Sequence, residues 1–187
     1  MRSKHSAGIL VYRLPGKSAE VLLGHMGGPF WAKKDNGAWS IPKGEFDPEA
    51  EDVLAAAKRE FTEETGQFPS FARSDLANNC SGYDPEQPDD RFIDLGTVVQ
   101  SNGKTVYAFA TAGDFDVAKA KSNTCKMEWP PRSGQKIEIP EIDRVEWFTL
   151  DKAKQKIVKG QIGFIDRLAK KLGIDPPADP LQQSALF

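Results

Sequence analysis

The sequence predicts a mixed α/β (α+β) domain from the order in which its segments follow one another. β-rich segments come first, a helical segment without Gly or Pro follows, and further β-rich segments lead into terminal helices. With 187 residues, the chain is long enough to bury a sizeable core in one domain. Its hydrophobic fraction of 39% and charged fraction of 28% are those of a globular protein. We expect residues 1–173 to form this domain and residues 174–187 to form a C-terminal tail.

Charge and cysteine content argue against several classes of protein. A formal net charge of -2 gives no global signal for binding nucleic acid or a membrane surface. The two cysteines, Cys80 and Cys125, are too few for a disulfide framework or a cysteine-rich zinc site. No stretch approaches the roughly 18–20 apolar residues of a membrane span, and the early apolar run ends at Arg13, which is typical of a first strand and not of a signal peptide. We therefore expect a cytoplasmic protein.

Turn residues separate the β-rich segments. Residues 6–13 and 20–25 flank a Pro15-Gly16 turn and predict a hairpin. A second hairpin is predicted around Asn102-Gly103. Further expected features are a glycine-rich loop over 26–39, a short strand over 39–42, an acidic loop over 43–52, a polar loop over 79–91, a rigid loop over 130–134 and a last strand over 145–150.

The central helical segment covers residues 53–65. Asp52 is a good N-cap, and Gly66 stands where a C-terminal cap belongs. Leu54, Ala57 and Phe61 recur at helical spacing and predict a buried stripe. Near the C-terminus, Asp151 is expected to cap a short helix over 152–158, and an amphipathic helix over 163–173 is expected to end at Gly173.

Three glutamates, Glu60, Glu63 and Glu64, lie in the last turns of the central helix. Spacings of three and four place their carboxylates on one face. The helix dipole is negative at this end, so three further negative charges cost stability there. A cation between the carboxylates would offset their repulsion. Hard oxygen ligands of this kind suit Mg²⁺ or Mn²⁺.

The spacing around these glutamates is specific. Glu51, Arg59, Glu60, Glu63, Glu64 and Gly66 are six fixed identities, which chance would produce on the order of once in 10⁷ positions. The segment GEFDPEAEDVLAAAKREFTEETG resembles the Nudix box, the signature of the Nudix hydrolases. It departs from the box where Glu45 occupies the slot of the opening glycine, one residue after Gly44, and where Gln67 occupies an apolar slot.

The resemblance extends over most of the chain and implies a Nudix fold, in which a mixed β-sheet is sandwiched between helices. Two further segments, GPFWAKKDNGAWSIPKGE and EWPPRSG, look like a bacterial subgroup described as NTP pyrophosphohydrolases. The resemblance implies Glu60 and Glu64 as the main metal ligands, with Glu63 as a ligand or base and the carbonyl of Gly44 completing the site. Arg59 is expected to pair with Glu51 or Glu63 and to hold the helix against the loop from outside the metal site.

Outside the box, the resemblance implies a further base or metal ligand, for which Glu141 is the candidate, ahead of Glu138 and Glu128. Lys43, Lys33, Lys34 and Arg132 are the candidates for binding phosphate. Trp31 is the candidate for stacking on a base, with Trp39 and Tyr83 as further aromatic residues. The two histidines, His5 and His25, are expected to be structural.

The implied activity is metal-dependent hydrolysis by water of a pyrophosphate bond in a nucleoside diphosphate linked to another group. A nucleoside triphosphate and a dinucleoside polyphosphate both fit. A small-molecule nucleotide is the expected partner, without nucleic acid or membrane, and the chain is expected to be a monomer or a homodimer. Two alternatives stay open. One is a nucleotide-sensing module without catalysis, and the other is an enzyme like isopentenyl-diphosphate isomerase, which would need a catalytic cysteine.

Overall fold

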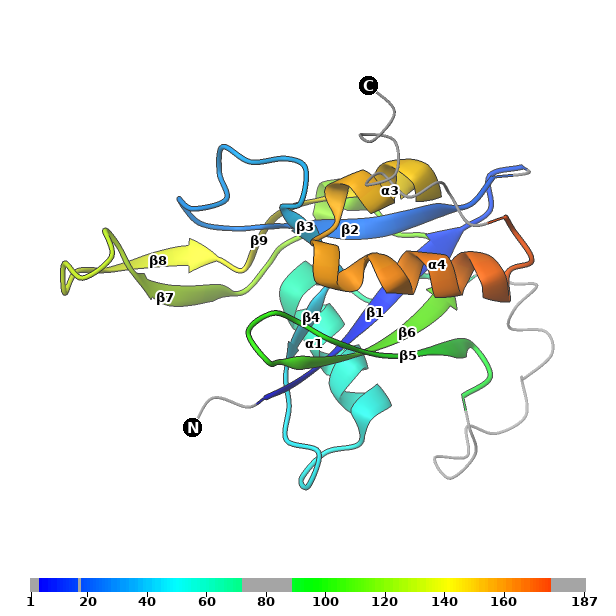
Figure 1. Cartoon of the computed structure of the whole chain (residues 1–187), viewed down its shortest axis with the longest axis horizontal. Coiled ribbons are helices and arrows are strands. Elements are labelled where there is room, and N and C mark those ends of the chain that lie inside the picture. Colours follow the sequence, from blue (N-terminus) through cyan, green and yellow to red (C-terminus); the bar gives the residue numbers. More distant parts are fainter. Residues whose placement is uncertain (1–3, 17, 72–88, 176–187) are drawn as a thin grey trace.

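A mixed β-sheet forms the centre of the molecule (Figure 1). Within residues 4–16, 18–71 and 89–175, which the computed structural model describes, seven strands make this sheet. Its strands are β1 (His5–Arg13), β2 (Glu20–Met26), β3 (Trp39–Ser40), β4 (Lys43–Glu45), β5 (Phe92–Val99), β6 (Thr105–Ala112) and β9 (Ile142–Thr149). Cys80, Tyr83, most of the predicted 79–91 loop and most of the predicted tail lie outside the described residues. The fold class predicted from the sequence is confirmed.

Strand β1 is the hub of the sheet. It runs parallel to β6 over its whole length and antiparallel to β2 at one end and to β4 at the other. Ile9, Leu10 and Val11 are fully buried, because both faces of the strand are covered. The N-terminal hairpin around Pro15-Gly16 is confirmed by the pairing of Tyr12 with Val21.

Helices cover the two faces of the sheet and create two hydrophobic cores (Figure 1). Helix α1 (Val53–Thr65) packs on the face that carries Ile9, and its Phe61 is fully buried there. Helices α3 (Leu150–Lys156) and α4 (Ile162–Lys171) pack on the face that carries Leu10. The short 3₁₀ helices η1 (Val117–Lys119) and η2 (Lys159–Gln161) complete the described helices.

Helix α1 has the predicted bounds. The side chain of Asp52 accepts hydrogen bonds from the backbone N–H groups of Leu54 (3.0 Å) and Ala55 (2.9 Å), which satisfies donors at the helix start. Gly66 ends the helix with a φ of +77°, a conformation that side chains with a Cβ rarely adopt. The predicted stripe is correct for Ala57 and Phe61, whereas Leu54 is only half-buried.

Two local predictions were wrong. Residues 43–45, expected in a loop, form β4, because Gly44 pairs with Ala7 of β1. Asp151 does not cap a helix over 152–158, since α3 begins at Leu150 directly after β9. Asp151 instead lies in the first turn of α3, where its negative charge meets the positive end of the helix dipole.

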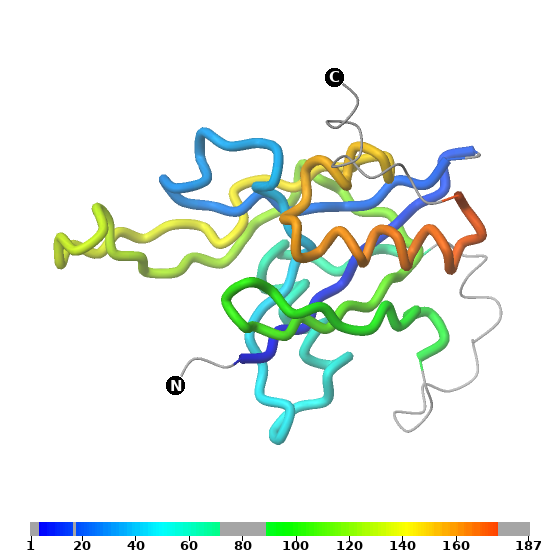
Figure 2. Tube along the Cα trace, in the orientation of Figure 1, coloured from blue at the N-terminus to red at the C-terminus, as the bar shows by residue number. Residues whose placement is uncertain are grey.

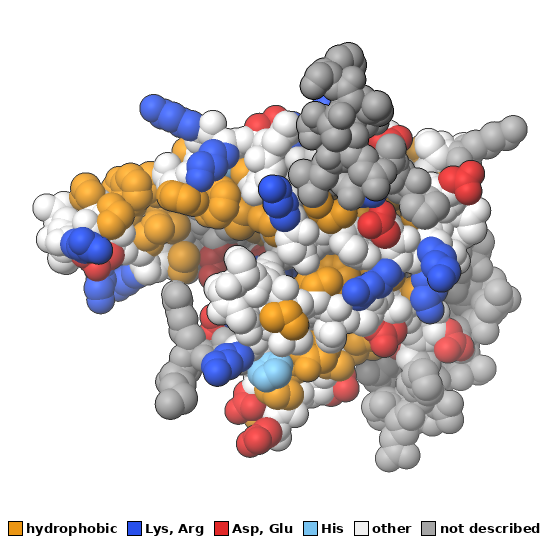
Figure 3. Space-filling model, viewed as in Figure 1, with side chains coloured by type: hydrophobic (Ala, Val, Ile, Leu, Met, Phe, Trp, Pro, Cys, Tyr) orange, Lys and Arg blue, Asp and Glu red, His pale blue; other side chains and the backbone are white. Residues whose placement is uncertain are grey.

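A second, two-stranded sheet was not predicted. Strands β7 (Thr124–Glu128) and β8 (Lys136–Pro140) form an antiparallel hairpin that extends from the body of the molecule (Figure 2). We call residues 124–140 the arm. The predicted 130–134 loop forms its tip. Along the arm, hydrophobic side chains such as Met127 and Ile139 alternate with exposed polar ones, and hydrophobic side chains are visible along it in Figure 3.

The loop over residues 27–38 is fixed by a buried histidine. His25 is fully buried, with Nδ1 2.8 Å from Oδ1 of Asp143 and Nε2 2.8 Å from the carbonyl oxygen of Lys34. The contact between His25 and Asp143 occurs at a β-bulge. His25 pairs with Arg144 and Met26 pairs with Ile142, so Asp143 is the extra residue of β9. The loop therefore has a defined position beside β9. None of the described helices is long and apolar enough to cross a membrane.

Candidate functional site

The last turns of α1 lie directly against the backbone of β4. The backbone N–H of Lys43 donates a hydrogen bond of 2.7 Å to Oε2 of Glu64. A Cβ built on Gly44 would lie 1.6 Å from Oε2 of Glu60, so that carboxylate takes up the space that a side chain would need. Glycine is therefore required at position 44 for β4 and α1 to approach this closely.

The three glutamates do not share one environment. Glu60 and Glu64 are buried, with 7% and 8% of their surface exposed. Glu63 is exposed, with 43% of its side chain accessible. The expected single face therefore separates into a buried pair against β4 and a third carboxylate at the solvent boundary.

Arg59 joins the buried pair to the loop before α1. Its Nε and Nη2 donate hydrogen bonds of 3.0 and 2.8 Å to the two carboxylate oxygens of Glu51, which is bidentate geometry. Its Nη1 lies 2.6 Å from Oε1 of Glu60 and 3.5 Å from Glu63. The bond to Glu51 lowers the pKa of that carboxyl group, and the bonds to Glu51 and Glu60 raise the pKa of Arg59 despite its partial burial.

Burial and mutual repulsion act strongly on the pair. Burial raises the pKa of Glu60, which Arg59 partly offsets, and the charges of Glu63 and Glu141 raise it further. Burial raises the pKa of Glu64 to about 8, against the attraction of Lys43 and with the repulsion of Glu141 and Glu60. Glu141, 81 positions after Glu60 in the sequence, is thus close enough to act electrostatically on both buried carboxylates.

The residues present fit a hard divalent cation. Two buried carboxylates with like charge lie against a glycine backbone, and their oxygen donors are those that Mg²⁺ and Mn²⁺ prefer. Within the described ranges, no three His, Cys, Asp or Glu side chains are gathered into a ready-made metal cage. Mg²⁺ usually keeps several waters and uses one or two carboxylates, so a pair of glutamates is a sufficient protein contribution.

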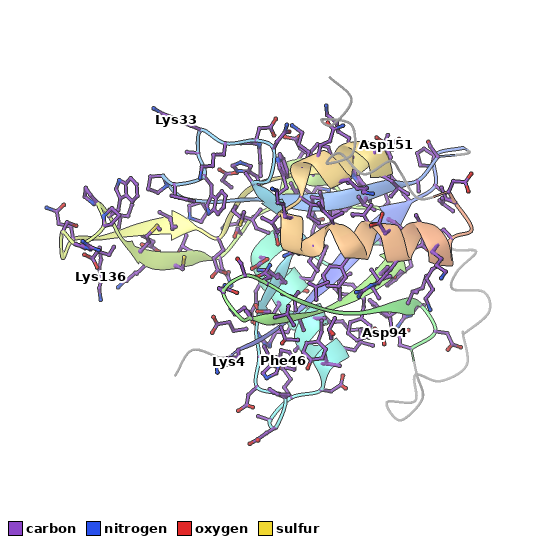
Figure 4. The ribbon with its side chains drawn as sticks, in the orientation of Figure 1. Lys4, Lys33, Phe46, Asp94, Lys136 and Asp151 are labelled. Atoms are coloured by element: carbon purple, nitrogen blue, oxygen red, sulfur yellow. The ribbon has the colours of Figure 1, made fainter. Side chains whose placement is uncertain are left out.

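The candidate phosphate-binding residues are spread over the molecule. Lys43 lies beside the carboxylates. Lys33 points outward from the 27–38 loop (Figure 4), and the Nζ of Lys34 lies 3.5 Å from the ring centroid of Phe30 and 4.7 Å from that of Trp31. Arg132 is at the tip of the arm, with a φ of +66°. In the described part of the chain, no hydrogen bond or ion pair joins Lys33, Lys34 or Arg132 to the carboxylates of α1.

Lys43 also lines a cavity of about 500 Å³, which we call the Lys43 cavity. Its walls come from the end of β2, the 27–38 loop, β3, the turn between β5 and β6, and η2. Sequence reasoning had assigned only Trp31 and Lys43 among its residues. The remainder carried no local signal, because Ser40 and Gln161, which are hydrogen-bonded to each other here, are 121 positions apart in the chain.

Comparison with known proteins agrees with this fold. The family model described as NUDIX domain matches residues 3–168. No curated protein matches the chain in sequence.

Solved structures that are similar to the chain include three of low sequence identity. An Ap4A hydrolase from C. elegans, in a binary complex, is 18% identical with a TM-score of 0.53, and the match covers 90% of this chain and 98% of that one. The NUDIX domain of Shewanella oneidensis NrtR, complexed with ADP ribose, is 13% identical with a TM-score of 0.56, covering 92% and 90%. A MutT protein from Methanosarcina mazei Go1 is 19% identical with a TM-score of 0.52, covering 90% and 94%. At these identities the likeness shows a shared fold.

Proposed function

The chain belongs to the Nudix family, and from this premise we propose that it is a metal-dependent nucleotide pyrophosphohydrolase. The reaction is hydrolysis of a pyrophosphate bond in a nucleoside diphosphate linked to another group, with a nucleoside triphosphate or a dinucleoside polyphosphate as the substrate. One observation carries the proposal. Glu60 and Glu64 are buried together against the backbone of β4, where their repulsion calls for a cation.

Each residue has a role in this proposal. Glu60 and Glu64 hold the Mg²⁺ or Mn²⁺, with the backbone of Gly44 beside them and Glu63 at the solvent boundary. Such an ion polarises a phosphoryl oxygen and neutralises charge on the leaving phosphate. Lys43, with its ammonium close enough to attract the Glu64 carboxylate, contacts a substrate phosphate. Arg59 and Glu51 keep the end of α1 in place against the preceding loop.

Glu141 is the proposed general base. It is exposed and acts electrostatically on both buried glutamates, so it borders the carboxylate site from the β9 side. The hydrogen bond from the backbone N–H of Gly27 to the carbonyl oxygen of Glu141, 3.0 Å long, fixes the backbone at this position. Glu63, by contrast, faces the guanidinium of Arg59. Among the described residues, Glu141 has no such ion-pair partner, and a carboxylate of this kind is better suited to accept a proton from the attacking water.

The neighbouring structures support the substrate class. One is an Ap4A hydrolase and another binds ADP ribose, which are facts about those proteins. For this chain they favour a nucleotide substrate. They also favour the second candidate function, a nucleotide-sensing domain without catalysis, since the domain that was solved with ADP ribose has the same fold.

An isomerase of the isopentenyl-diphosphate type would need a cysteine at the carboxylate site. Cys125 lies on β7 of the arm, and Cys80 lies outside the described residues. The substitutions Cys80→Ser and Cys125→Ser, made separately, test this alternative. Full hydrolytic activity in both variants would remove it.

A substrate panel tests the proposed function. Purified protein with Mg²⁺ or Mn²⁺ is offered diadenosine tetraphosphate, the common nucleoside triphosphates, ADP-ribose, NADH and a nucleotide sugar, and the products are separated by chromatography. Glu64→Gln is the inactive variant, and Glu49→Gln, an exposed carboxylate outside the site, is its matched control. We expect turnover that is lost in Glu64→Gln and kept in Glu49→Gln. Metal-independent binding of a nucleotide without turnover would instead favour the sensing domain.

A further inference from the structure

The Lys43 cavity has an unusual charge for this protein. Among the described residues, its lining includes Lys43 and Lys159 but no Asp or Glu, although the chain as a whole has a formal net charge of -2. A second cavity, of about 660 Å³ near η1, contains two acidic residues, Asp114 and Asp116, beside its basic ones. An anionic ligand is therefore favoured by the Lys43 cavity and not by the second one.

Part of the lining of the cavity is apolar. Met26, Trp31 and Val158 are half-buried and contribute to it. The indole of Trp31 is held in place by an edge-to-face contact with Phe30, 4.8 Å between ring centroids, and its backbone N–H donates to the carbonyl of Gly28 at 3.1 Å. An indole fixed in this way provides a surface on which an aromatic ring can stack.

Gln100 adds an amide to the lining of the cavity. The Cγ of Gln100 would lie 3.4 Å from a Cβ at Gly160, so the absence of a side chain there lets Gln100 pack against η2. Gln100 is half-buried, and within the described residues its side-chain amide makes no hydrogen bond, while its backbone groups bond to Lys104 and Gly103. The amide has a donor and an acceptor side by side, the pattern that matches the N6–H and N7 edge of adenine.

Lys43 connects this cavity to the carboxylates. Lys43 is one of the residues that line the cavity, and its backbone N–H is bonded to Glu64. The volume of about 500 Å³ lies within the range of about 300–1,000 Å³ that small-molecule sites occupy, and a nucleoside is of suitable size. A phosphate chain that leaves the cavity past Lys43 would reach Glu60 and Glu64.

We propose that the Lys43 cavity holds the nucleoside of the substrate, with Trp31 stacked on the base and Gln100 as the residue that selects adenine over guanine. This inference rests on the proposed function, because it places the nucleoside relative to the carboxylate site. It adds the location of the nucleoside, the preferred base and the role of Gln100, whose position in the sequence carries no motif.

The test measures binding in EDTA, so that no hydrolysis occurs, by isothermal titration calorimetry of the full chain. The ligands are ATP, GTP and inorganic tripolyphosphate, which has the phosphates but no nucleoside. Trp31→Ala is expected to weaken ATP binding roughly tenfold and to leave tripolyphosphate binding unchanged, because stacking acts on the base alone. Trp31→Phe should restore most of the ATP affinity. Trp129→Ala, on the arm, is the matched tryptophan control and should bind ATP like the unmodified protein.

Gln100→Leu tests the base selection separately. The unmodified protein is expected to bind ATP at least about fivefold more tightly than GTP, and Gln100→Leu to bind the two equally, since one bidentate contact discriminates by about that much or more. Circular dichroism of each variant establishes that it is folded. An equal loss of ATP and tripolyphosphate binding in Trp31→Ala, or no preference for ATP in the unmodified protein, would overturn the assignment.

The two proposals fail differently. If Glu64→Gln abolishes turnover while Trp31→Ala and Gln100→Leu leave nucleotide binding unchanged, the cavity assignment falls and the hydrolase proposal stands. If ATP binds as expected and no substrate of the panel is turned over, the cavity assignment stands and the hydrolase proposal falls.

Discussion

Replacing Glu64 by Gln removes one buried negative charge and keeps the shape of the side chain. The amide oxygen of Gln can still accept the 2.7 Å hydrogen bond from the backbone N–H of Lys43. The variant therefore isolates the cost of burying the Glu64 charge, to which the neighbouring charges of Glu141 and Glu60 add. Without a metal ion, that cost depends on pH, and its size follows from the pKa of Glu64.

The pKa of Glu64 is about 8 in the folded protein, against 4.5 for an ordinary Glu. The folded state thus keeps a proton on this group over a pH range in which the unfolded chain has lost it. The free energy of unfolding falls as pH rises through this interval, and the full penalty is present above pH 8. Integrating the difference in bound protons between pH 5 and pH 8 gives a loss on the order of 3–4 kcal/mol from this one residue.

Urea denaturation in EDTA at pH 5, 6, 7 and 8, followed by circular dichroism, measures this loss. The unmodified protein should lose on the order of 3–4 kcal/mol more than Glu64→Gln between the two ends of the range, with the curves diverging steadily above pH 5. Glu49→Gln, whose carboxylate is exposed, should follow the unmodified protein. Parallel curves for Glu64→Gln and the unmodified protein would refute the reasoning, because they would mean that Glu64 is not held in a repulsive, desolvated site.

Four further outcomes follow from the site. Gly44→Ala places a Cβ 1.6 Å from Oε2 of Glu60. The free energy of unfolding, measured with urea, should fall by about 1–3 kcal/mol, and turnover should fall about a hundredfold. Unchanged kinetics would contradict the close approach of β4 and α1. Arg59→Met removes the 2.6 Å partner of Glu60 and should cost about 1–3 kcal/mol at pH 8 and less at pH 5, because burial raises the pKa of Glu60 and favours its neutral form as pH falls; an equal cost at both pH values would speak against this. Mg²⁺ at ten times its dissociation constant should add about 1.4 kcal/mol to the free energy of unfolding. A melting temperature that does not change on addition of millimolar Mg²⁺ would contradict this. Glu141→Gln should lower kcat about 10²–10⁴-fold with little change in KM, and full activity would move the role of base to Glu63.

The sequence predicted the parts of the fold that depend on neighbouring residues. The bounds of α1 follow from a capping aspartate, an uninterrupted run of helix formers and a terminal glycine, all of which act within a few positions. The box resemblance named the residues that meet at the end of this helix. It could not show that Glu63 is exposed while Glu60 and Glu64 are buried, because that difference is set by β4, whose pairing with β1 joins residues far apart in the chain.

The arm shows a signal that was present but weak. Cys125, Met127, Ile137 and Ile139 alternate with polar residues, as in strands with one apolar face. Each strand has only five residues, and the prolines between them favoured interpretation as an isolated loop. The positions of Lys34 and Gln100 carry no such signal. Lys34 is positioned by the contact of its carbonyl oxygen with the buried His25. Gln100 is positioned by the packing of its turn against Gly160 of η2, which is distant in the sequence.

Arg59 contacts three carboxylates, and the two that it holds most closely, Glu51 and Glu60, differ in how many of its hydrogen bonds they take. Glu51 accepts two hydrogen bonds along one edge of the guanidinium, whereas Glu60 accepts a single one from Nη1. A cation that competes for Glu60 therefore displaces one bond, and the arginine, whose side chain is 38% exposed, stays paired and hydrated. Glu60 can exchange its partner without any opening of α1. The amides of this helix should then remain protected from hydrogen exchange while the ion enters and leaves, so ion exchange can be much faster than any unfolding of the site.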